Sequence, residues 1–183
     1  MRYKETEIEG LIIIEVEPFQ DHRGKFYRVY CKKELKSIGY NKELLQINQS
    51  LTKKKGAIRG MHFQYPPKAE TKIVKCLKGS IFDVVIDLRN KSPTFLHWHG
   101  EILSADNMKM LYIPEGFAHG FQALEDNSEL LYFHTEIYSP DHESGIRHDD
   151  PIICIKWPLE ICDVSERDRS FELLDNNFKG LII

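Results

Sequence analysis

The sequence lacks several features that mark whole classes of protein. Its 183 residues carry a net charge of −3, so there is no surplus of basic residues to attract nucleic acid or an anionic membrane surface. No apolar run approaches the length needed to cross a bilayer. The four cysteines lack the paired spacing of a zinc site, and no secretory leader precedes them. We therefore expect a cytoplasmic protein with reduced thiols that binds neither nucleic acid nor membrane.

What the sequence does contain is a series of short runs rich in β-branched and aromatic residues. Runs such as GLIIIEV, SIFDVVIDL and ELLYFHTEIY are separated by turn signals such as YPP, KGS, NKSP and EDNS, and ICIKWP is the last predicted strand. Many short strands without a βαβ rhythm favour an antiparallel sandwich or barrel. No linker or repeat divides the chain, so residues 1–183 are interpreted as one domain.

Helical patterns are confined to two places. The stretch KKELKSIGYNKELL begins after Cys31, and Gly39 is its expected stop. The second is the tail from about Asp163 to Asp175. The expected fold is therefore mainly β, with short helices after residue 31 and in the C-terminal tail.

The heptapeptide IRGMHFQ, Ile58–Gln64, places an ionisable ring in the middle of a predicted strand. His62 can be a core histidine whose ring nitrogens are satisfied by hydrogen bonds, or it can be a functional group. The residues that the rest of the chain places beside it decide between these interpretations.

Polar and aromatic side chains share one face of two later strands. His119 alternates with the two phenylalanines of FAHGFQAL, and ELLYFHTEIY carries Tyr132 and His134 on the face opposite its apolar residues. A mixed face of this kind is typical of a ligand cavity. Arg59 and Lys72 flank it and either bind an anion there or lie solvated at a strand edge.

The stretch HWHGE offers an alternative that involves a metal ion. His97, His99 and Glu101 alternate along a strand, and PEGFAH has the P-x-G-x-x-H form of the second motif of metal cupins. The first motif of those proteins brings two histidines and a glutamate together, whereas the upstream run here offers His62 alone. We therefore expect no metal site and interpret His97 and His99 as residues of a solvated edge strand.

Seven blocks of the sequence occur in the order and at the spacing of one enzyme family. The blocks are DHRGKF, IRGMHFQYPP, KIVKCLKGSIFDVVIDLRNKSPTF, LSADN, YIPEGFAHGF, ELLYFHTEIYSP and DDPIICIKWP. From about Ile12 to Asp168 the chain resembles the dTDP-4-dehydrorhamnose 3,5-epimerase family. The resemblance implies a metal-free, cupin-like antiparallel β-barrel of the jelly-roll type that needs no cofactor. It also implies a homodimer with exchanged N-terminal strands, and a nucleotide-diphosphate 4-keto-sugar substrate used in making cell-surface polysaccharides.

The resemblance also implies catalytic roles. His62, the histidine of the R-G-x-H motif, would be the general base, and Asp168 would be its carboxylate partner. Tyr132 would act as the acid on the opposite face of the sugar. Lys72 and His119 would stabilise the enolate.

A second set of residues would bind the substrate. Two arginines are placed for the diphosphate, an aromatic residue and a third arginine for the end that carries the base, and two amides for the rest of the substrate. A second tyrosine near the predicted acid completes the set. These residues are Arg59 and Arg23 for the diphosphate, Phe26 and Arg28 for the end that carries the base, Gln46 and Asn48 for the rest of the substrate, and Tyr138 as the second tyrosine.

Inverting a carbon beside a ketone demands groups of these types. A base removes a proton from one face, cations hold the enolate, and an acid returns a proton on the other face. A ketone at C4 acidifies both C3 and C5. For Arg59 and His62 to reach one ligand, the strict alternation of their strand must break, so we predict a bulge or twist at Gly60.

Two positions depart from the family pattern and leave alternatives open. Arg28 stands where the family usually has a glutamate, and Ile137 stands where it often has a tyrosine. These changes alter which base edge or phosphate can be bound, and they make room for a longer sugar. The nucleotide is therefore open between dTDP and GDP, and the sugar between a 4-keto-6-deoxy hexose and heptose. A C3-only epimerase, a sugar 3,4-ketoisomerase and a non-catalytic sugar-nucleotide binding module are further alternatives.

Overall fold

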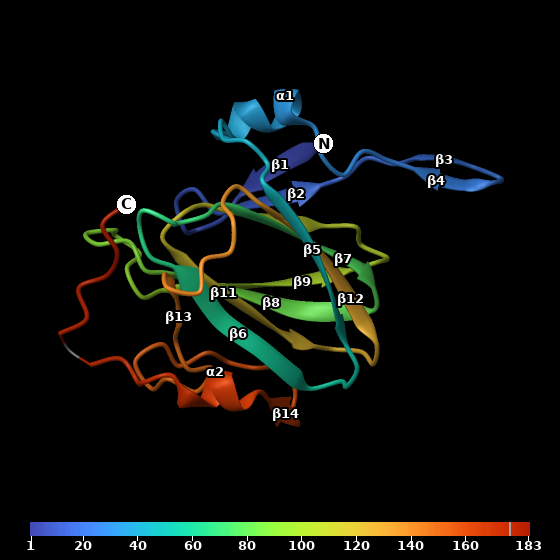
Figure 1. Cartoon of the computed structure of the whole chain (residues 1–183). Helices are drawn as coiled ribbons and strands as arrows, with labels where there is room; N and C mark the ends of the chain where they lie inside the picture. The colour runs from blue at the N-terminus through green and yellow to red at the C-terminus, as the bar shows by residue number, and fades with distance from the viewer. Residues whose placement is uncertain (176) are drawn as a thin grey trace.

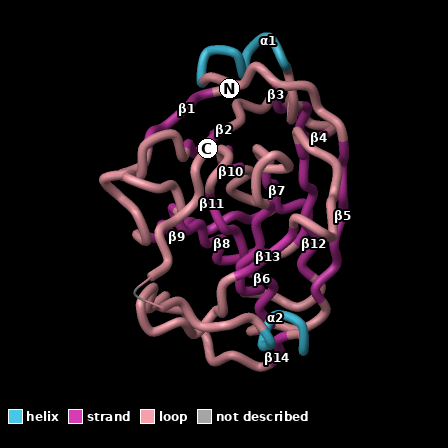
Figure 2. Tube along the Cα trace, turned by 60° about the vertical axis from the view of Figure 1, so that its left-hand side comes forward, coloured by secondary structure: helices cyan, strands magenta, loops and turns pink. Residues whose placement is uncertain are grey.

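The computed structural model describes residues 1–175 and 177–183 and is built mainly from β-strands (Figures 1 and 2). Its strands are β1 (Arg2–Glu5), β2 (Ile12–Glu15), β3 (Phe19–Asp21), β4 (Gly24–Phe26), β5 (Gln46–Thr52), β6 (Ala57–Gln64), β7 (Lys72–Lys78), β8 (Ser80–Asp87), β9 (Trp98–Ser104), β10 (Met110–Ile113), β11 (Phe117–Ala123), β12 (Ser128–His134), β13 (Glu143–Gly145) and β14 (Asp163–Val164). Its helices are α1 (Lys32–Leu35), the 3₁₀ turn η1 (Lys36–Ile38) and α2 (Glu166–Ser170).

Two six-stranded sheets make up the body of the molecule. The first has the order β1-β2-β10-β7-β12-β5, and the second the order β13-β6-β11-β8-β9, with β14 paired to β6 outside that path. All the strand pairs are antiparallel except β14 with β6. From β5 to β8 the chain changes sheet at every step, and it does so again from β9 to β13. The predicted antiparallel barrel of jelly-roll type is confirmed, although the two sheets are not closed into one.

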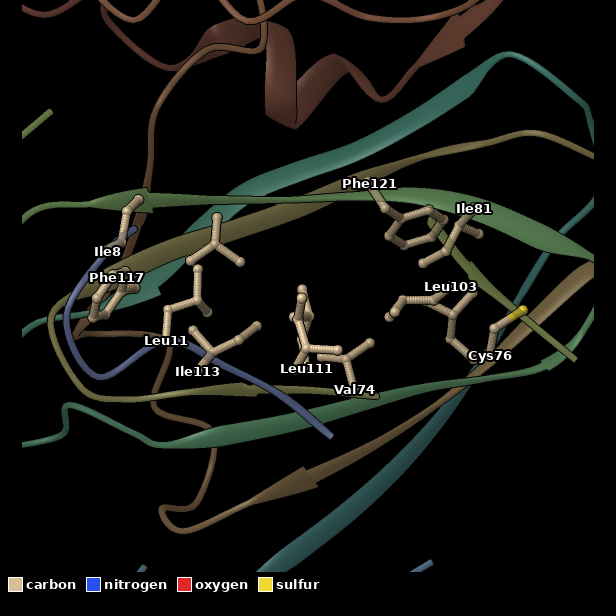
Figure 3. Packing of buried hydrophobic residues seen from close by; sticks show 13 residues of the cluster. Ile8, Leu11, Val74, Cys76, Ile81, Leu103, Leu111, Ile113, Phe117 and Phe121 are labelled. Carbon is tan, nitrogen blue, oxygen red and sulfur yellow. The ribbon is translucent and has the colours of Figure 1, made fainter. Parts of the chain in front are cut away.

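The space between the sheets holds an apolar core (Figure 3). Inward positions of β7, β8 and β10 supply Val74, Ile81 and Leu111, each fully buried, because alternate residues of a strand point to the same face. Burying an aliphatic side chain of this size stabilises a fold by about 1.5–3 kcal/mol. Two inward positions of these strands are polar. Lys72 begins β7, and Asp83 lies in β8 between Ile81 and Val85 of the core.

The outer faces of both sheets are covered by the two ends of the chain. Leu35 of α1 packs on the first sheet, and Tyr30 stacks on Phe133 of β12 at a centroid distance of 5.9 Å. The C-terminal tail packs Trp157 and other apolar residues on the second sheet. This tail carries α2 to the side of β6 (Figure 1).

The hairpin of β3 and β4 extends away from both sheets (Figure 1). Phe19 and Phe26 lie opposite each other in this hairpin and are 79% and 76% exposed. In the single chain these aromatic side chains therefore bury little of their surface.

Three local expectations need correction. The predicted helix after residue 31 stops at Gly39 as expected, with φ of 87°, but NKELL beyond it is not helical. The tail helix is shorter than predicted and spans Glu166–Ser170. The predicted strand at Ile153–Pro158 was wrong, because Asp150 accepts the N–H of Ile153 and closes a turn there. Among the described residues, no helix combines the length and apolarity needed to span a bilayer.

Candidate active site

A cavity of about 980 Å³ opens between the two sheets. One wall comes from β5, β7 and β12 of the first sheet, and the other from β6 and β11 of the second. Residues 163–168, in β14 and α2, close one side. The volume lies at the upper end of the range for small-molecule sites, so the cavity accommodates a ligand with several groups.

On the wall of the second sheet, a bulge brings Arg59 and His62 into the same cavity. His62 lies opposite His119 of β11, but Arg59 lies opposite Phe121, so β6 has one residue more than its partner in this interval. The predicted irregularity at Gly60 is therefore confirmed. Both Arg59 and His62 line the cavity despite their odd spacing.

Gly60 is required at this bulge for two reasons. Its φ is 130°, in a region that favours glycine. A Cβ there would also lie 2.5 Å from Cα of Gly120 and 3.0 Å from the carbonyl oxygen of His119. A larger residue would push the two strands apart.

The His62 ring is paired with a buried carboxylate from the other end of the chain. His62 Nε2 donates to Asp168 Oδ1 at 2.7 Å, and the N–H of Gly60 donates to Oδ2 at 3.2 Å. Ser165 caps α2 by accepting the N–H of Asp168 at 3.0 Å, which fixes the carboxylate beside β6. Burial acts to raise the pKa of Asp168, but the hydrogen bonds with His62 and Gly60 outweigh it and hold the pKa below its ordinary value.

A second imidazole–carboxylate pair lies on the same wall. His119 Nε2 donates to Asp83 Oδ1 at 2.8 Å, and Asp83 is completely buried in β8. Burial raises the pKa of the Asp83 carboxyl, and the attraction of His119 offsets only part of that effect. Asp83 Oδ2 has no partner among the described residues. The wall of the second sheet thus presents two histidines, each backed by an acid.

The wall of the first sheet presents a buried phenol. Tyr132 of β12 lies between Asn48 of β5 and Val74 of β7, and its hydroxyl is 3.0 Å from Ser50 Oγ. Burial raises the pKa of Tyr132, and the hydrogen bond with Ser50 reduces that shift only in part. The phenol therefore stays protonated at neutral pH and can donate a proton into the cavity.

Two residues after Tyr132 in β12, His134 takes part in a line of contacts with Glu70 and Lys72. His134 is opposite Lys72 of β7 and Gln46 of β5 in the register. Glu70 contacts both of the other two side chains. Its Oε1 is 3.0 Å from Lys72 Nζ, and its Oε2 accepts from His134 Nδ1 at 2.7 Å. Burial acts to raise the pKa of Glu70, but Lys72 and His134 outweigh it and keep the pKa low. The carboxylate is therefore ionised between its two partners.

The mouth of the cavity carries a third group of polar residues. Tyr138 donates its hydroxyl hydrogen to Glu143 Oε2 at 2.7 Å, and Arg167 of α2 pairs with the same oxygen. Tyr138 lies beyond the end of β12, the strand that carries Tyr132. All three residues line the cavity.

Three predicted substrate-binding residues lie elsewhere in the single chain. Arg23 and Phe26 belong to the projecting hairpin, and Arg23 forms an ion pair with Asp21. Arg28 forms an ion pair with Glu34 near α1. None of the three is among the residues that line the cavity of their own chain.

The alternative metal-site residues have other contacts. His99 Nδ1 contacts Glu7 at 2.8 Å, and Glu101 accepts from Lys109 at 2.8 Å. His97 is exposed and precedes β9, which is the edge strand of the second sheet. The interpretation of an edge strand is confirmed, but the His99 side chain is only 12% exposed and is not solvated as expected.

Comparison with known proteins settles the family. The family model for dTDP-4-dehydrorhamnose 3,5-epimerase matches residues 5–176. The chain belongs to this family. It is 42% identical over 179 residues to the dTDP-4-dehydrorhamnose 3,5-epimerase of Methanothermobacter thermautotrophicus, a match that covers 96% of both chains.

Solved structures support the same membership of the epimerase family. The dTDP-4-dehydrorhamnose 3,5-epimerase from Bacillus anthracis, solved with TDP and PPi bound, has a TM-score of 0.91 and 42% identity, covering 94% of this chain and 99% of the other. The dTDP-6-deoxy-D-glucose-3,5-epimerase from Legionella pneumophila, in complex with dTDP-4-keto-L-rhamnose, has a TM-score of 0.92 and 36% identity. That match covers 100% of this chain and 98% of the other. The cupin-like barrel is thus shared with structures of this epimerase family.

Sequence reasoning missed several residues of the epimerase site. Asp83 could have been noticed as the one acid in the middle of the apolar run IFDVVID. His134 was placed on the polar face without a role, and Glu70 was not considered. Arg167 and Glu143 carry no pattern that separates them from surface charges, because their place at the cavity depends on how the tail folds back.

Proposed function

We propose that this protein inverts C3 and C5 of a dTDP-linked 4-keto-6-deoxy hexose by removing and returning protons. The observation that carries the proposal is the placement of an imidazole–carboxylate pair and a buried phenol on opposite walls of one cavity. A sugar ring between these walls would have a base on one face and an acid on the other. Inversion at a carbon beside a ketone needs this arrangement.

In the first step His62 takes the proton from C3 or C5. Its Nε2 already donates to Asp168, so Nδ1 is the ring atom that accepts the proton. The ionised Asp168 fixes this tautomer and stabilises the imidazolium that forms. Arg59 enters the same cavity through the bulge at Gly60 and supplies a cation for the diphosphate.

The negative charge that leaves carbon collects on the C4 oxygen as an enolate. Lys72 would supply an ammonium on one wall, and His119 would donate from Nδ1 on the other as an imidazolium, because its Nε2 already bonds to Asp83. Preorganised donors of this kind are usually the largest single contribution to catalysis in such sites. Tyr132 then returns a proton to the opposite face of the carbon, and the epimer forms.

The names of the relatives support dTDP as the nucleotide. The solved relatives include one with TDP and PPi bound and one in complex with dTDP-4-keto-L-rhamnose. Arg28, which raised the alternative of GDP, does not line the cavity of its own chain. The deciding experiment is incubation of the protein in deuterium oxide with dTDP-4-keto-6-deoxyglucose, its GDP counterpart and a GDP-linked 4-keto heptose.

Proton NMR of the products distinguishes the alternatives. We expect deuterium at both C3 and C5 of the dTDP sugar, with inversion at both. Deuterium at C3 alone would indicate a C3-only epimerase, and a ketone moved to C3 would indicate a ketoisomerase. Preference for a GDP sugar would overturn the dTDP assignment, and binding without any exchange would leave a sugar-nucleotide binding module.

The proposal includes a homodimer in which each copy lends its β3–β4 hairpin to the cavity of the other. The hairpin projects from the sheets, and its Phe26 is 76% exposed (Figure 1). Arg23 carries an exposed guanidinium at the same hairpin. Both residues match family positions expected at the substrate, and a second copy would bring them there.

Hybrid dimers test this exchange. We would co-express a His62→Ala chain with an Arg23→Ala chain under different affinity tags. If hairpins are exchanged, each heterodimer has one intact site, and a randomly mixed population recovers about a quarter of the wild-type rate. If each chain completes its own cavity, every site carries one defect, and mixing restores nothing. Light scattering of the wild-type protein would give the subunit number.

The remaining parts of the proposal concern context. We infer that residues 1–183 act as one catalytic domain, in keeping with a family match over residues 5–176. The four cysteines are free thiols, in keeping with a reducing cytoplasm. The epimerised sugar would serve the synthesis of cell-surface polysaccharides.

A further inference from the structure

We propose that Glu70 and His134 are positioning residues that hold the Lys72 ammonium in place for the enolate. The inference rests on the proposed function, because it concerns how the proposed oxyanion stabiliser is fixed. It adds two residues that sequence reasoning did not assign to catalysis. It also explains why a carboxylate is buried beside a site where negative charge develops.

The geometry of the three residues has the form of a clamp. Glu70 lies two residues before Lys72, the first residue of β7. Glu70 Oε1 is 3.0 Å from Lys72 Nζ, and Oε2 is 2.7 Å from His134 Nδ1. The three side chains are 10%, 12% and 10% exposed. One carboxylate therefore joins Lys72 of β7 to His134 of β12, and all three residues line the cavity.

Lys72 needs such a clamp because a lysine side chain is flexible. Holding its rotatable bonds in one arrangement costs rotamer entropy. Among the described residues, Glu70 is the one side chain that forms an ion pair with Lys72 Nζ. A charge that is fixed before the reaction requires no reorganisation when the enolate appears.

His134 acts through Glu70. Its Nδ1 donates to the carboxylate, and its Nε2 has no partner among the described residues. Its ring also lies nearly parallel to that of Tyr132, at 24° and 6.1 Å between centroids. Without the hydrogen bond from His134, one oxygen of Glu70 would be left unpaired, and the carboxylate could turn away from Lys72.

The test measures deuterium exchange at the sugar carbons in single and double variants. Glu70→Ala should slow exchange by about 10- to 100-fold, because small displacements of a catalytic group have effects of this size. Glu70→Gln keeps an oxygen that accepts from Lys72 and should restore most of the rate. His134→Phe should slow exchange by about 2- to 10-fold, the usual effect of one hydrogen bond.

The double variants separate positioning from packing. Because His134 acts through Glu70, the variant with both Glu70→Ala and His134→Phe should be no slower than Glu70→Ala alone. In a Lys72→Ala background, Glu70→Ala should cause no further loss. Affinity for dTDP, which lacks the sugar, should stay within about twofold of wild type in every variant, and this also reports that each variant is folded.

Three results would overturn the inference. They are a normal exchange rate in Glu70→Ala, losses that multiply in the double variant, and a Glu70→Gln protein as slow as Glu70→Ala. Each requires that the wild-type protein exchanges protons of the substrate. A wild-type protein that binds dTDP sugars without exchange would instead remove the proposed function and this inference with it.

Discussion

The two walls of the cavity differ in how their ionisable groups are supported. On the second sheet, each histidine is backed by a carboxylate from a distant part of the chain, His62 by Asp168 and His119 by Asp83. The first sheet also holds one such pair, His134 with Glu70, but the hydroxyl of Tyr132 bonds to another hydroxyl, Ser50 Oγ. The proposed acid is thus supported by a neutral group and the proposed base by a carboxylate.

The difference supports the proposed roles of Tyr132 as the acid and His62 as the base at one pH. Burial raises the pKa of Tyr132 because no cation close by stabilises the phenolate enough to offset it. On the second sheet the ionised Asp168 accepts a hydrogen bond from the His62 ring instead. Two titratable groups whose environments push their pKa values apart can serve as an acid and a base at one pH.

The largest effect is expected from removing the base. His62→Ala should lower the epimerisation rate by about 10²- to 10⁴-fold, the typical contribution of a positioned base. The measurement is the rate of deuterium exchange at C3 and C5. His97→Ala is the control, because His97 is exposed and lies outside the cavity. Exchange at the wild-type rate in His62→Ala would show that the second sheet does not provide the base.

Removing the acid should separate exchange from inversion. In Tyr132→Phe the enolate would still form, but it could be reprotonated only from the side of His62. In deuterium oxide this variant should therefore place deuterium in the starting sugar while little epimer appears. Tyr65→Phe, outside the cavity, is the matched control. If exchange and inversion fall together, Tyr132 is not the acid, and Tyr138 at the cavity mouth becomes the next candidate.

Removing the carboxylate partner of His62 should have a smaller effect on the rate of epimerisation. Asp168→Asn should lower it by about tenfold, because His62 loses the carboxylate that orients its ring. Glu166→Gln, an exposed change in the same helix, is the control. A wild-type rate in Asp168→Asn would mean that the pair with His62 is not used.

The same variant makes a prediction about stability. Since the pKa of Asp168 is lowered in the folded protein, its carboxylate stabilises the fold above its ordinary pKa of about 4. This contribution is lost as the pH falls through the lower, folded value. Urea unfolding should therefore show a deficit for Asp168→Asn at pH 7 that shrinks below about pH 4. A deficit independent of pH would mean that the lost stability comes from packing.

The smallest effect concerns the bulge that shapes the base wall. Gly60 and Gly24 have nearly equal φ values, 130° and 132°, but a Cβ would clash only at Gly60. Both alanine variants store backbone strain of about 1–3 kcal/mol. Gly60→Ala should lose more free energy of unfolding than Gly24→Ala, because it also pushes β6 from β11. Equal losses would show that the strand contact does not hold the bulge.

Much of this arrangement follows from local patterns in the chain. Alternation predicted that Tyr132 and His119 face a cavity, and the odd spacing of Arg59 and His62 predicted the bulge at Gly60. The pairing of His62 with Asp168 came from the resemblance to the family, because nothing in the local sequence connects residues 106 positions apart.

Other features could not be predicted because they depend on tertiary packing. The run ICIKWP has the composition of a strand, yet hydrogen bonds to Asp150 turn the backbone there. Glu70 looks like a surface charge until the register of β7 and β12 brings Lys72 beside His134. The contacts that the β3–β4 hairpin would make with a second copy depend on the arrangement of two chains, and no local sequence pattern specifies that arrangement.

The distance in sequence between His62 and Asp168 has a consequence for synthesis on the ribosome. The strands of both walls are complete by His134, but the carboxylate that orients the base arrives only with α2. A nascent or prematurely terminated chain would therefore hold a nearly finished barrel with an unassisted imidazole. The proposed base pair therefore forms only after Asp168 has been added, and a chain that ends before this residue would lack the carboxylate partner of His62.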